Sequence, residues 1–460
     1  MRVLLVNPPK NYRTKKNAWS YVGSNMPPLG LASIAAVLEN NGHEVKILDA
    51  CAEGMSVVDV VEWFARDSCW NFLGITATTP LINFALKIAE GVKQRNSEVK
   101  IVLGGVHPSV FPDRILQAPA VDFVVRGEGE FTMLELVSGN ALESINGLSY
   151  LVSGKAVHTP DRELIENLDL LPMPAYHLLP MKLYRPALGA AKREPAISML
   201  ATRGCPGRCT FCFRQFGKKL RYRSGLLIAK EVKYLQDTYG IREICFYDDT
   251  FTALRKEVRD FCTELERLKV KISWSCFSRV DTFHEETFRL MHESGCHQVM
   301  FGVESASAEI LKNINKRIDI DRAEHVIRST MKMGILVRAA FMLGNMGETL
   351  ETMEKTLEWA LRVDPDLAVF NITTPYPGSE LFDWAAENDF LTSYDWDKYD
   401  LATPILSLPT VDAETVARFY KYALRRFYLR PGKVMKIGLR MMNPRGFMQL
   451  YRGLRMMLGL

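Results

Sequence analysis

Short apolar segments alternate with amphipathic segments along most of this chain, and the alternation limits the folds that are open to it. In the first 130 residues the apolar segments have the composition of buried strands, and segments with helical spacing lie between them. Strands that alternate with helices form a parallel sheet with helices on its faces. We therefore predict an α/β fold that begins with a doubly wound parallel sheet. The candidate strands are residues 2–9, 43–50, 71–80, 99–109 and 121–130.

A second strand–helix pattern runs from residue 196 to residue 378 and repeats about six times. Each of its candidate strands ends in polar or glycine residues. Eight such units close a complete barrel, so six units predict a partial (β/α)6 barrel with its chemistry at the C-terminal strand ends. The candidate strands are residues 196–204, 243–249, 272–281, 298–305, 336–345 and 367–378.

The chain has 460 residues, which exceeds one compact core and indicates several domains. We expect a Rossmann-like domain over 1–140, a linker over 141–190, the partial barrel over 191–380 and a helical C-terminal region over 381–460. No uncharged apolar run approaches the roughly 18 residues that span a bilayer. The first residues also lack the pattern of a signal peptide, so we expect a cytoplasmic protein.

Three cysteines, Cys205, Cys209 and Cys212, lie within eight positions on the loop that follows the first barrel strand. A structural zinc site is the simplest alternative, but it needs four ligands, and no second cysteine pair lies nearby. Three thiolates can instead hold three corners of a [4Fe–4S] cluster and leave the fourth iron open to another ligand. The spacing therefore predicts an open iron–sulfur cluster.

This cysteine spacing, followed by "FYDDTF" and "FGVES" at later strand ends, resembles the radical S-adenosylmethionine (SAM) superfamily. The resemblance implies that the amine and carboxylate of SAM occupy the open iron. It also implies that an electron from the cluster cleaves SAM and releases a 5′-deoxyadenosyl radical. An electron donor such as a flavodoxin or a ferredoxin is then expected as a partner.

The same resemblance assigns roles to residues near the strand ends. Phe211 matches the aromatic residue that packs near adenine. Asp248 and Asp249 lie where the family holds the methionyl amine, and a carboxylate suits an ammonium group. Glu304 matches the acid that contacts the ribose or the amine. Each of these acids alone is also compatible with a solvated charge or a barrel ion pair.

Two more residues are assigned in the same way. Arg338, at the start of the fifth barrel strand, is expected to meet the methionyl carboxylate. Gly344 is expected to allow a close backbone approach, although "LGNMGE" departs from the more common Gly-Leu-Pro-Gly-Glu form. Tyr247, Arg279 and Tyr376 also fall at strand ends and are candidates for substrate contact.

The N-terminal segments "NPP", "PPLGLASIAAVLE", "GGVHPS" and "VDFVVRGEGE" resemble the cobalamin-binding domain that precedes the barrel in many radical SAM enzymes. Small and hydroxyl residues at the strand ends suit a phosphate-bearing ligand tail. The Asp-x-His-x-x-Gly motif of cobalamin-binding mutases is missing. We read His107 as a structural or tail-contacting residue and not as a cobalt ligand. The residues expected to contact cobalamin are Thr76, Thr78, Gly104, Gly105, Val106 and Glu128.

The resemblance to cobalamin-dependent radical SAM enzymes implies a function. The first expectation is methyl transfer to an unactivated carbon of a hydrophobic lipid, isoprenoid or tetrapyrrole substrate. The alternative is radical cyclisation or rearrangement of the anaerobic magnesium-protoporphyrin ester cyclase type. A tRNA methylthiolase is disfavoured because only Cys51 and Cys69 precede residue 205, too few for a second three-cysteine cluster. A non-catalytic corrinoid-binding module is disfavoured by the intact cysteine motif.

The last 40 residues are both basic and apolar. Residues 421–460 contain ten Lys or Arg and no Asp or Glu, in a chain whose net charge is +5. Apolar and basic residues fall on different faces of two candidate helices, as in helices that lie at a membrane surface. Peripheral contact with the inner face of the membrane is slightly favoured over packing on the barrel. We expect no specific binding of nucleic acid.

Overall fold

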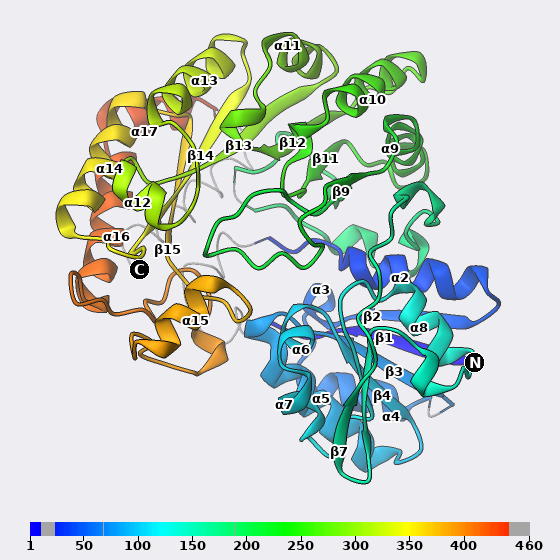
Figure 1. The fold of residues 1–460 in the computed structure, drawn as a ribbon. Coiled ribbons are helices and arrows are strands. Elements are labelled where there is room, and N and C mark those ends of the chain that lie inside the picture. Colours follow the sequence, from blue (N-terminus) through cyan, green and yellow to red (C-terminus); the bar gives the residue numbers. More distant parts are fainter. Residues whose placement is uncertain (11–23, 68, 188, 441–460) are drawn as a thin grey trace.

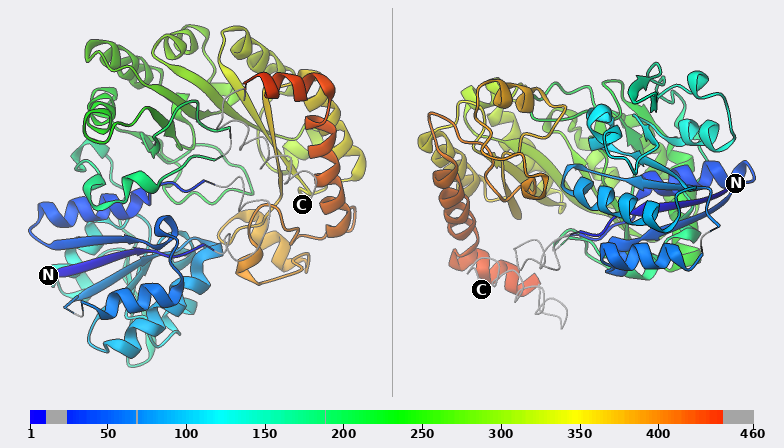
Figure 2. Two further views of the ribbon diagram at one scale, coloured as in Figure 1. Left: turned by 180° about the vertical axis from the view of Figure 1, so that it is seen from behind. Right: turned by 90° about the horizontal axis from the view of Figure 1, so that it is seen from below.

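The computed structural model describes residues 1–10, 24–67, 69–187 and 189–440. Two sheets lie side by side: the N-terminal sheet, in blue and cyan, and the barrel sheet, in green and yellow (Figure 1). The helices Ala413–Tyr428 and Pro431–Arg440 lie at the edge of the barrel away from the N-terminal sheet, whereas the segment that contains the helix Glu380–Glu387 lies beside the N-terminal domain (Figure 2). The limits of the four predicted segments remain predictions.

The N-terminal sheet has seven strands in the order β2-β1-β3-β4-β5-β6-β7. The first five strands pair in parallel, as predicted, and β6 and β7 add an antiparallel hairpin at one edge. This hairpin falls in the segment predicted to be a linker. The strands are Arg2–Asn7 (β1), Glu44–Asp49 (β2), Phe72–Thr76 (β3), Lys100–Gly104 (β4), Phe123–Val125 (β5), Leu148–Val152 (β6) and Lys155–His158 (β7).

Helices cover both faces of this sheet, which confirms the doubly wound prediction. Buried residues of α2 and α8 share one core with the barrel sheet, and those of α4 and α5 form a separate core on the other face. The Ser56 side chain and Asp59 form a capping box that begins α4. The helices are Leu29–Asn40 (α2), Ala50–Glu53 (α3), Val57–Ala65 (α4), Ile82–Arg95 (α5), Val106–Val110 (α6), Pro112–Leu116 (α7) and Glu130–Val137 (α8).

The segment between the two sheets contains short 3-10 turns at Leu168–Leu170, Tyr176–Leu178 and Met181–Leu183. Its side chains bond to the N-terminal sheet and to a helix of the barrel. The buried Tyr176 hydroxyl donates to Glu231 Oε1 at 2.7 Å, and the Tyr184 hydroxyl donates to Asp49 Oδ2 at 2.9 Å. The segment therefore fixes the first sheet against the barrel.

The barrel sheet has six parallel strands in the order β15-β14-β13-β12-β11-β8, which confirms the predicted partial barrel. The strands are Ala196–Met199 (β8), Glu243–Phe246 (β11), Ser273–Ser278 (β12), Cys296–Glu304 (β13), Leu336–Leu343 (β14) and Leu367–Ile372 (β15). A two-residue pair, Thr202–Arg203 (β9) with Arg221–Tyr222 (β10), brackets the cysteine loop.

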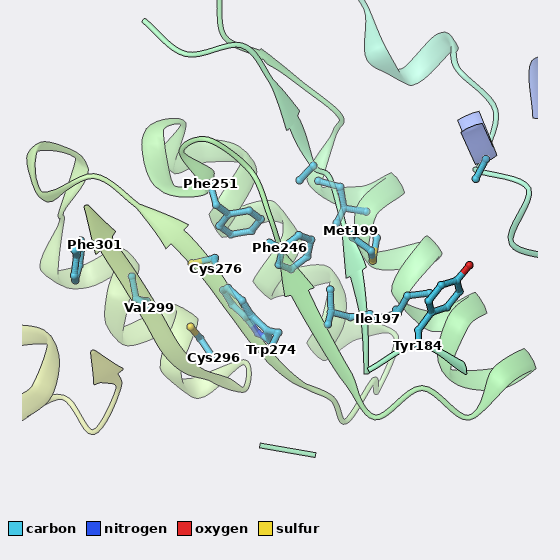
Figure 3. Packing of buried hydrophobic residues seen from close by; sticks show 14 of the residues in the cluster. Tyr184, Ile197, Met199, Phe246, Phe251, Trp274, Cys276, Cys296, Val299 and Phe301 are labelled. Atoms are coloured by element: carbon cyan, nitrogen blue, oxygen red, sulfur yellow. The ribbon is translucent and has the colours of Figure 1, made fainter. Parts of the chain in front are cut away.

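Helices pack against the outer face of the barrel sheet. Phe246, Phe251 and Trp274 meet there, with the Phe246 and Phe251 rings 4.5 Å apart (Figure 3). Aromatic side chains of this size supply much of the apolar area that holds helices to a sheet. The helices are Gly225–Tyr239 (α9), Arg255–Arg267 (α10), Glu285–Glu293 (α11), Ala308–Asn313 (α12), Ile320–Lys332 (α13) and Leu350–Val363 (α14).

The C-terminal region comprises Glu380–Glu387 (α15), Ala413–Tyr428 (α16) and Pro431–Arg440 (α17). Helix α16 covers the edge strand β15, where the Tyr428 hydroxyl donates to the Ala368 carbonyl at 2.7 Å. Within the described part of the chain, no helix is long and apolar enough to cross a membrane. The second candidate tail helix falls in 441–460, outside the described residues.

Candidate active site

The cysteine loop leaves the barrel at the C-terminal end of β8, where a barrel places reactive groups. Gly204 stands immediately before Cys205 with φ at +88°. A Cβ atom at this position would lie 2.2 Å from the Lys219 carbonyl oxygen, so only glycine allows the turn. A glycine is therefore required directly before the first cysteine, because the end of the loop returns close to this position.

Cys205, Cys209 and Cys212 are free thiols on this loop. Burial raises the pKa of the Cys205 thiol, and the nearby Asp249 carboxyl and Cys209 thiol also raise it. In the described residues, no three His, Cys, Asp or Glu side chains are close enough to bind one metal ion.

Two basic residues lie beside the thiols. The Arg279 guanidinium interacts electrostatically with Cys209 and Cys205. It also forms an ion pair with Asp281 at 2.7 Å. Lys316, which is buried, acts on Cys209 and pairs with Glu304 at 2.9 Å. Positive charge at this place favours thiolates over thiols. Lys316 was not predicted, because nothing local in its loop sequence marks it.

The two neighbouring acids after β11 have different surroundings. Asp248 is fully buried, and its Oδ1 accepts from the Ala201 N–H at 2.9 Å and from the Thr202 N–H. Its Oδ2 has no partner among the described residues, and burial raises its pKa to about 7. Asp249 makes no hydrogen bond or ion pair to the described residues and faces the cavity. Partial burial raises the pKa of its carboxyl.

Glu304 ends β13 in a conformation that non-glycine residues rarely adopt, with φ at +69°. Its side chain turns back across the strand toward Lys316. A Cβ on Gly302 would lie 2.3 Å from Glu304 Oε1 and 3.0 Å from Lys316 Nζ. The glycine of the "FGVES" motif therefore leaves room for the ion pair. Strained acids of this kind are concentrated at functional sites.

These groups surround a cavity at the C-terminal strand ends of the barrel, with about 1120 Å³ of empty space including its mouth. The cavity brings together most of the predicted residues of the SAM site, and Tyr247, Arg279 and Tyr376 also line it. The residues that face it include Phe211, Tyr247, Asp248, Asp249, Phe277, Arg279, Met300, Glu304, Lys316, Met342 and Tyr376.

Two predicted residues lie elsewhere. Gly344 packs against Val416 of α16, where a Cβ would come within 3.2 Å, so its close approach is to a helix. Arg338 lies on β14 two residues before Ala340, on the inner side of the barrel but outside the cavity lining. Their predicted contacts with SAM remain predictions.

A second cavity, with about 1160 Å³ of empty space, lies between the N-terminal sheet and the cysteine loop. Thr76, Gly104, Gly105 and Glu128 line it, whereas Thr78 and Val106 do not belong to its lining. From the barrel side, residues next to the cysteines complete the wall. These residues are Thr202, Arg203, Gln215 and Phe216.

Backbone without side chains forms much of the wall on the N-terminal side. Gly105 has φ at +97°, and a Cβ there would lie 2.9 Å from the Ala77 carbonyl oxygen. Gly30, Gly74, Gly127 and Gly129 contribute further wall without side chains. Such a wall lets an extended polar ligand approach the carboxyl ends of the strands closely.

A buried ion-pair network joins this cavity to the cysteine loop. Arg203 donates to Glu128 Oε1 at 2.8 Å and to Glu130 Oε1 at 2.5 Å. Arg221 donates to Glu128 Oε2 at 2.8 Å. Burial alone would raise the pKa of Glu128, but hydrogen bonds from Arg221 and Arg203 outweigh it and hold the pKa below its usual value.

His107 does not line either cavity. It is 1% exposed, bonds Thr79 Oγ1 through Nδ1 at 3.3 Å, and packs against Phe111 and Trp396. Burial lowers its pKa to about 4, with a smaller effect from Arg114. Of the two roles expected for His107, these contacts fit the structural one.

Comparisons with known proteins match the two halves of this site. A B12 binding domain model matches residues 18–137, and a Radical SAM superfamily model matches residues 199–360. The uncharacterized methyltransferase PH0819 of Pyrococcus horikoshii is 38% identical over 443 residues, which cover 95% of this chain and 94% of the relative. The chain belongs to the cobalamin-dependent radical SAM enzyme family.

Another relative of this radical SAM enzyme is the anaerobic magnesium-protoporphyrin IX monomethyl ester cyclase of Rubrivivax gelatinosus. It is 30% identical over 442 residues, which cover 93% of this chain and 78% of the cyclase. The fold is similar to that of the radical SAM methyltransferase TsrM from Kitasatospora setae, solved with cobalamin and a [4Fe–4S] cluster. The TM-score is 0.69 at 20% identity, over 84% of this chain and 75% of TsrM.

These findings confirm the predicted family, fold class and enzyme class of this radical SAM enzyme. The two family matches also confirm the predicted cofactor set of cobalamin, a [4Fe–4S] cluster and SAM. The residues present fit these groups. Three free thiols beside two cations suit an iron–sulfur cluster. The cavity walled by glycine backbone suits the tail of a corrinoid.

Proposed function

We propose that this enzyme transfers a methyl group to an unactivated carbon of a hydrophobic small molecule. One observation carries the part of the proposal that joins two cofactors: residues flanking the cysteine motif, Arg203 and Phe216, form a wall of the same cavity as the strand ends of the B12-binding domain. The two cofactor regions therefore adjoin. The relative from Pyrococcus horikoshii, which is similar over nearly its whole length, is named as a methyltransferase.

We propose that Cys205, Cys209 and Cys212 hold the cluster. Thr76, Gly104, Gly105 and Glu128 then contact the corrinoid tail, with Thr78 and Val106 at the rim. When bound, these groups supply a one-electron cleavage of SAM and a methyl group for transfer. Arg279 and Lys316 offset the negative charge of the thiolates, which favours their deprotonated state.

The barrel cavity positions SAM in this proposal. Asp249, whose carboxylate makes no bond to the described residues, accepts hydrogen bonds from the methionyl ammonium group. Asp248 offers its free Oδ2 beside it. Glu304 contacts the ribose from its position across the cavity, and Phe211 packs near adenine. The apolar walls exclude water, which would quench a radical or a reactive methyl donor.

Radical cyclisation is the second candidate, and the name of the Rubrivivax gelatinosus relative favours it. Both reactions need the same cofactors. They differ in whether a methyl group is added to the substrate. The arrangement of the cofactor residues is compatible with either, so the proposal for methyl transfer depends on the methyltransferase relative.

The experiment uses reconstituted holoenzyme, dithionite and SAM with a trideuterated methyl group, incubated anaerobically with a lipid and pigment extract of the source cells. Methyl transfer predicts products that carry three deuterium atoms, and their loss in a Cys209→Ala variant. Products that change mass without deuterium would favour cyclisation and contradict the proposal.

We further propose that a flavodoxin or a ferredoxin supplies the electron. A reduced ferredoxin that replaces dithionite in the same assay supports this, and no turnover with either protein contradicts it.

Peripheral contact with the inner face of the membrane is also proposed. Lys433 of α17 is buried and pairs with Asp364 at 2.8 Å, so this basic side chain faces the barrel. Val434 and Met435 are 45% and 65% exposed, which leaves apolar surface outward. Sedimentation with anionic phospholipid vesicles tests the contact. A Met435→Glu variant should bind less, and equal binding would contradict the proposal.

A further inference from the structure

Arg338 is a partly buried cation without a counter-ion among the described residues. Its Nε is buried and has no hydrogen-bond partner, and its guanidinium makes no ion pair to any residue that the structure describes. A cation that is partly withdrawn from water and left without a partner loses hydration that no described residue replaces. A protein retains such a group where a ligand completes it. The place of Arg338 in the barrel shows which ligand that is.

The side chain of Arg338 points toward the barrel cavity. Alternate residues of a strand face the same side, and Ala340 and Met342 of the same strand line the cavity. Arg338 therefore faces inward one step below Ala340, toward the N-terminal ends of the strands. Its register partner on β13 is Met300, which also lines the cavity. Arg338 thus lies just below the residues that line the deep end of the cavity, whereas the cysteine loop lies at the mouth.

The groups around Arg338 do not neutralise it. The titratable side chains that act on it are Tyr428, Tyr247 and Cys245, all of which are uncharged at neutral pH. Burial dominates and lowers the pKa of the guanidinium from its ordinary value. No carboxylate of the described residues is among the groups whose charge acts on it. The site is built from neutral polar and apolar groups around one cation.

The other cations of the cavity wall already have partners. Arg279 pairs with Asp281 at 2.7 Å, and Lys316 pairs with Glu304 at 2.9 Å. Arg279 and Lys316 interact electrostatically with cysteines of the loop, whereas none of the three cysteines interacts in this way with Arg338. A methionyl carboxylate held beside the cysteines would therefore lie closer to Arg279 and Lys316 than to Arg338.

The wall between the deep end and the mouth is mainly apolar. Phe277 stacks on Tyr247 with ring centroids 5.2 Å apart, and Met300 and Met342 lie beside them. We propose that Arg338 binds an anionic group of the substrate, a carboxylate or a phosphate, while an apolar body lies against Phe277 and the two methionines. A guanidinium binds either group through two parallel hydrogen bonds. This inference rests on the proposed function and narrows its substrate class to amphipathic anions.

The test measures binding of three probes to anaerobically reconstituted holoenzyme by calorimetry: decanoate, decyl phosphate and decanol. The proposal predicts that at least one anionic probe binds tenfold or more tightly than decanol. It also predicts that Arg338→Gln removes this difference, whereas Arg322→Gln, at an exposed arginine of α13, keeps it. Tighter binding of either anion supports the proposal and names the headgroup. Equal binding of decanol, or normal anion binding by Arg338→Gln, overturns it.

A second measurement separates ligand binding from a structural role. Because Arg338→Gln removes a partly buried charge that has no partner among the described residues, its thermal midpoint should equal or exceed that of the wild type. A midpoint lower by several degrees would show that the folded chain already satisfies the cation, and would overturn the proposal. So would a variant that binds the probes normally but cleaves SAM poorly, since the guanidinium would then serve the methionyl carboxylate.

The proposed function is followed separately in the same wild-type sample. Bound corrinoid and formation of 5′-deoxyadenosine report it, and neither depends on the probes. If both are absent while decanoate still binds through Arg338, the proposed function fails and the anion site stands. If both are present while the anionic probes bind no better than decanol, the anion site fails and the proposed function stands.

Discussion

Arg203, two residues before the first cysteine of the trio, pairs with Glu128 of the N-terminal sheet at 2.8 Å, and both side chains are almost fully buried. The pair joins residues 75 positions apart in the chain. It connects the loop of the cluster cysteines to a wall of the corrinoid cavity. This contact and Arg221 beside it are therefore among the contacts that set the spacing between the corrinoid cavity and the cysteine loop.

Glu128→Gln should lower the stability of the folded chain by ~3–5 kcal/mol, because it removes the carboxylate that pairs with the buried Arg221 and one of the two carboxylates that pair with Arg203. Urea unfolding of the chain measures the change. Glu414→Gln is the matched control, because it breaks an exposed pair with Arg418 at 3.3 Å, which contributes at most about 1 kcal/mol. Equal losses in the two variants would show that the buried network contributes no more than a surface pair.

Asp249→Asn should weaken SAM binding by roughly 30-fold, since a hydrogen bond to a charged group contributes about 2 kcal/mol. The dissociation constant of SAM, measured on the reconstituted enzyme, checks this. Asp321→Asn, at an exposed position in the first turn of α13, is the control. A dissociation constant within twofold of the wild type would exclude Asp249 from the ammonium site.

Gly302→Ala should abolish most SAM cleavage while the fold is kept. The added methyl group would meet Glu304 Oε1 at 2.3 Å and Lys316 Nζ at 3.0 Å, so the ion pair must move. The rate of 5′-deoxyadenosine formation is the readout. A Cβ atom at Gly432 would have no neighbouring atom within 4 Å, so the control Gly432→Ala should behave as the wild type. A wild-type rate in Gly302→Ala would mean that this ion pair does not position SAM.

The buried His107 should make the stability of the folded chain depend on pH. Burial lowers its pKa to about 4, so the folded chain holds it neutral while the unfolded chain protonates it near pH 6.5. Its contribution is complete above pH 6.5 and is lost as the pH falls toward 4. Between pH 7.5 and pH 5 the loss is roughly 2 kcal/mol.

Urea unfolding at these two pH values measures the loss in the wild type and in His107→Gln. The variant should lose less stability on acidification by about that amount. His325→Gln, at an exposed histidine, should match the wild type. The same pH dependence in all three proteins would contradict a buried neutral His107.

The sequence predicted the features that local patterns determine. Six strand segments and the three-cysteine loop each depend on neighbouring residues, so the partial barrel and the cluster loop were predictable. The hairpin of β6 and β7 was missed because its strands are short, and "KAVH" carries little apolar signal. A weak strand of this kind is specified by the sheet edge that it joins.

Contacts between distant segments were not predictable. The Arg203–Glu128 pair and the Lys316–Glu304 pair depend on how distant segments of the chain pack together. From sequence alone, a charged residue in a loop is usually expected to be exposed to solvent. The expected role of Gly344 shows the same limit. Its spacing in the motif was clear, but its neighbour proved to be Val416 of a C-terminal helix.

The central claim is that one chain holds a corrinoid and an SAM-cleaving cluster next to each other. The most direct test reconstitutes the protein anaerobically with iron, sulfide and hydroxocobalamin, and records its visible spectrum. The assay then measures 5′-deoxyadenosine formed from SAM under dithionite, with Cys209→Ala as the control. The account predicts bound base-off corrinoid, and 5′-deoxyadenosine that depends on Cys209. Cleavage of SAM by a protein that binds no corrinoid would contradict it.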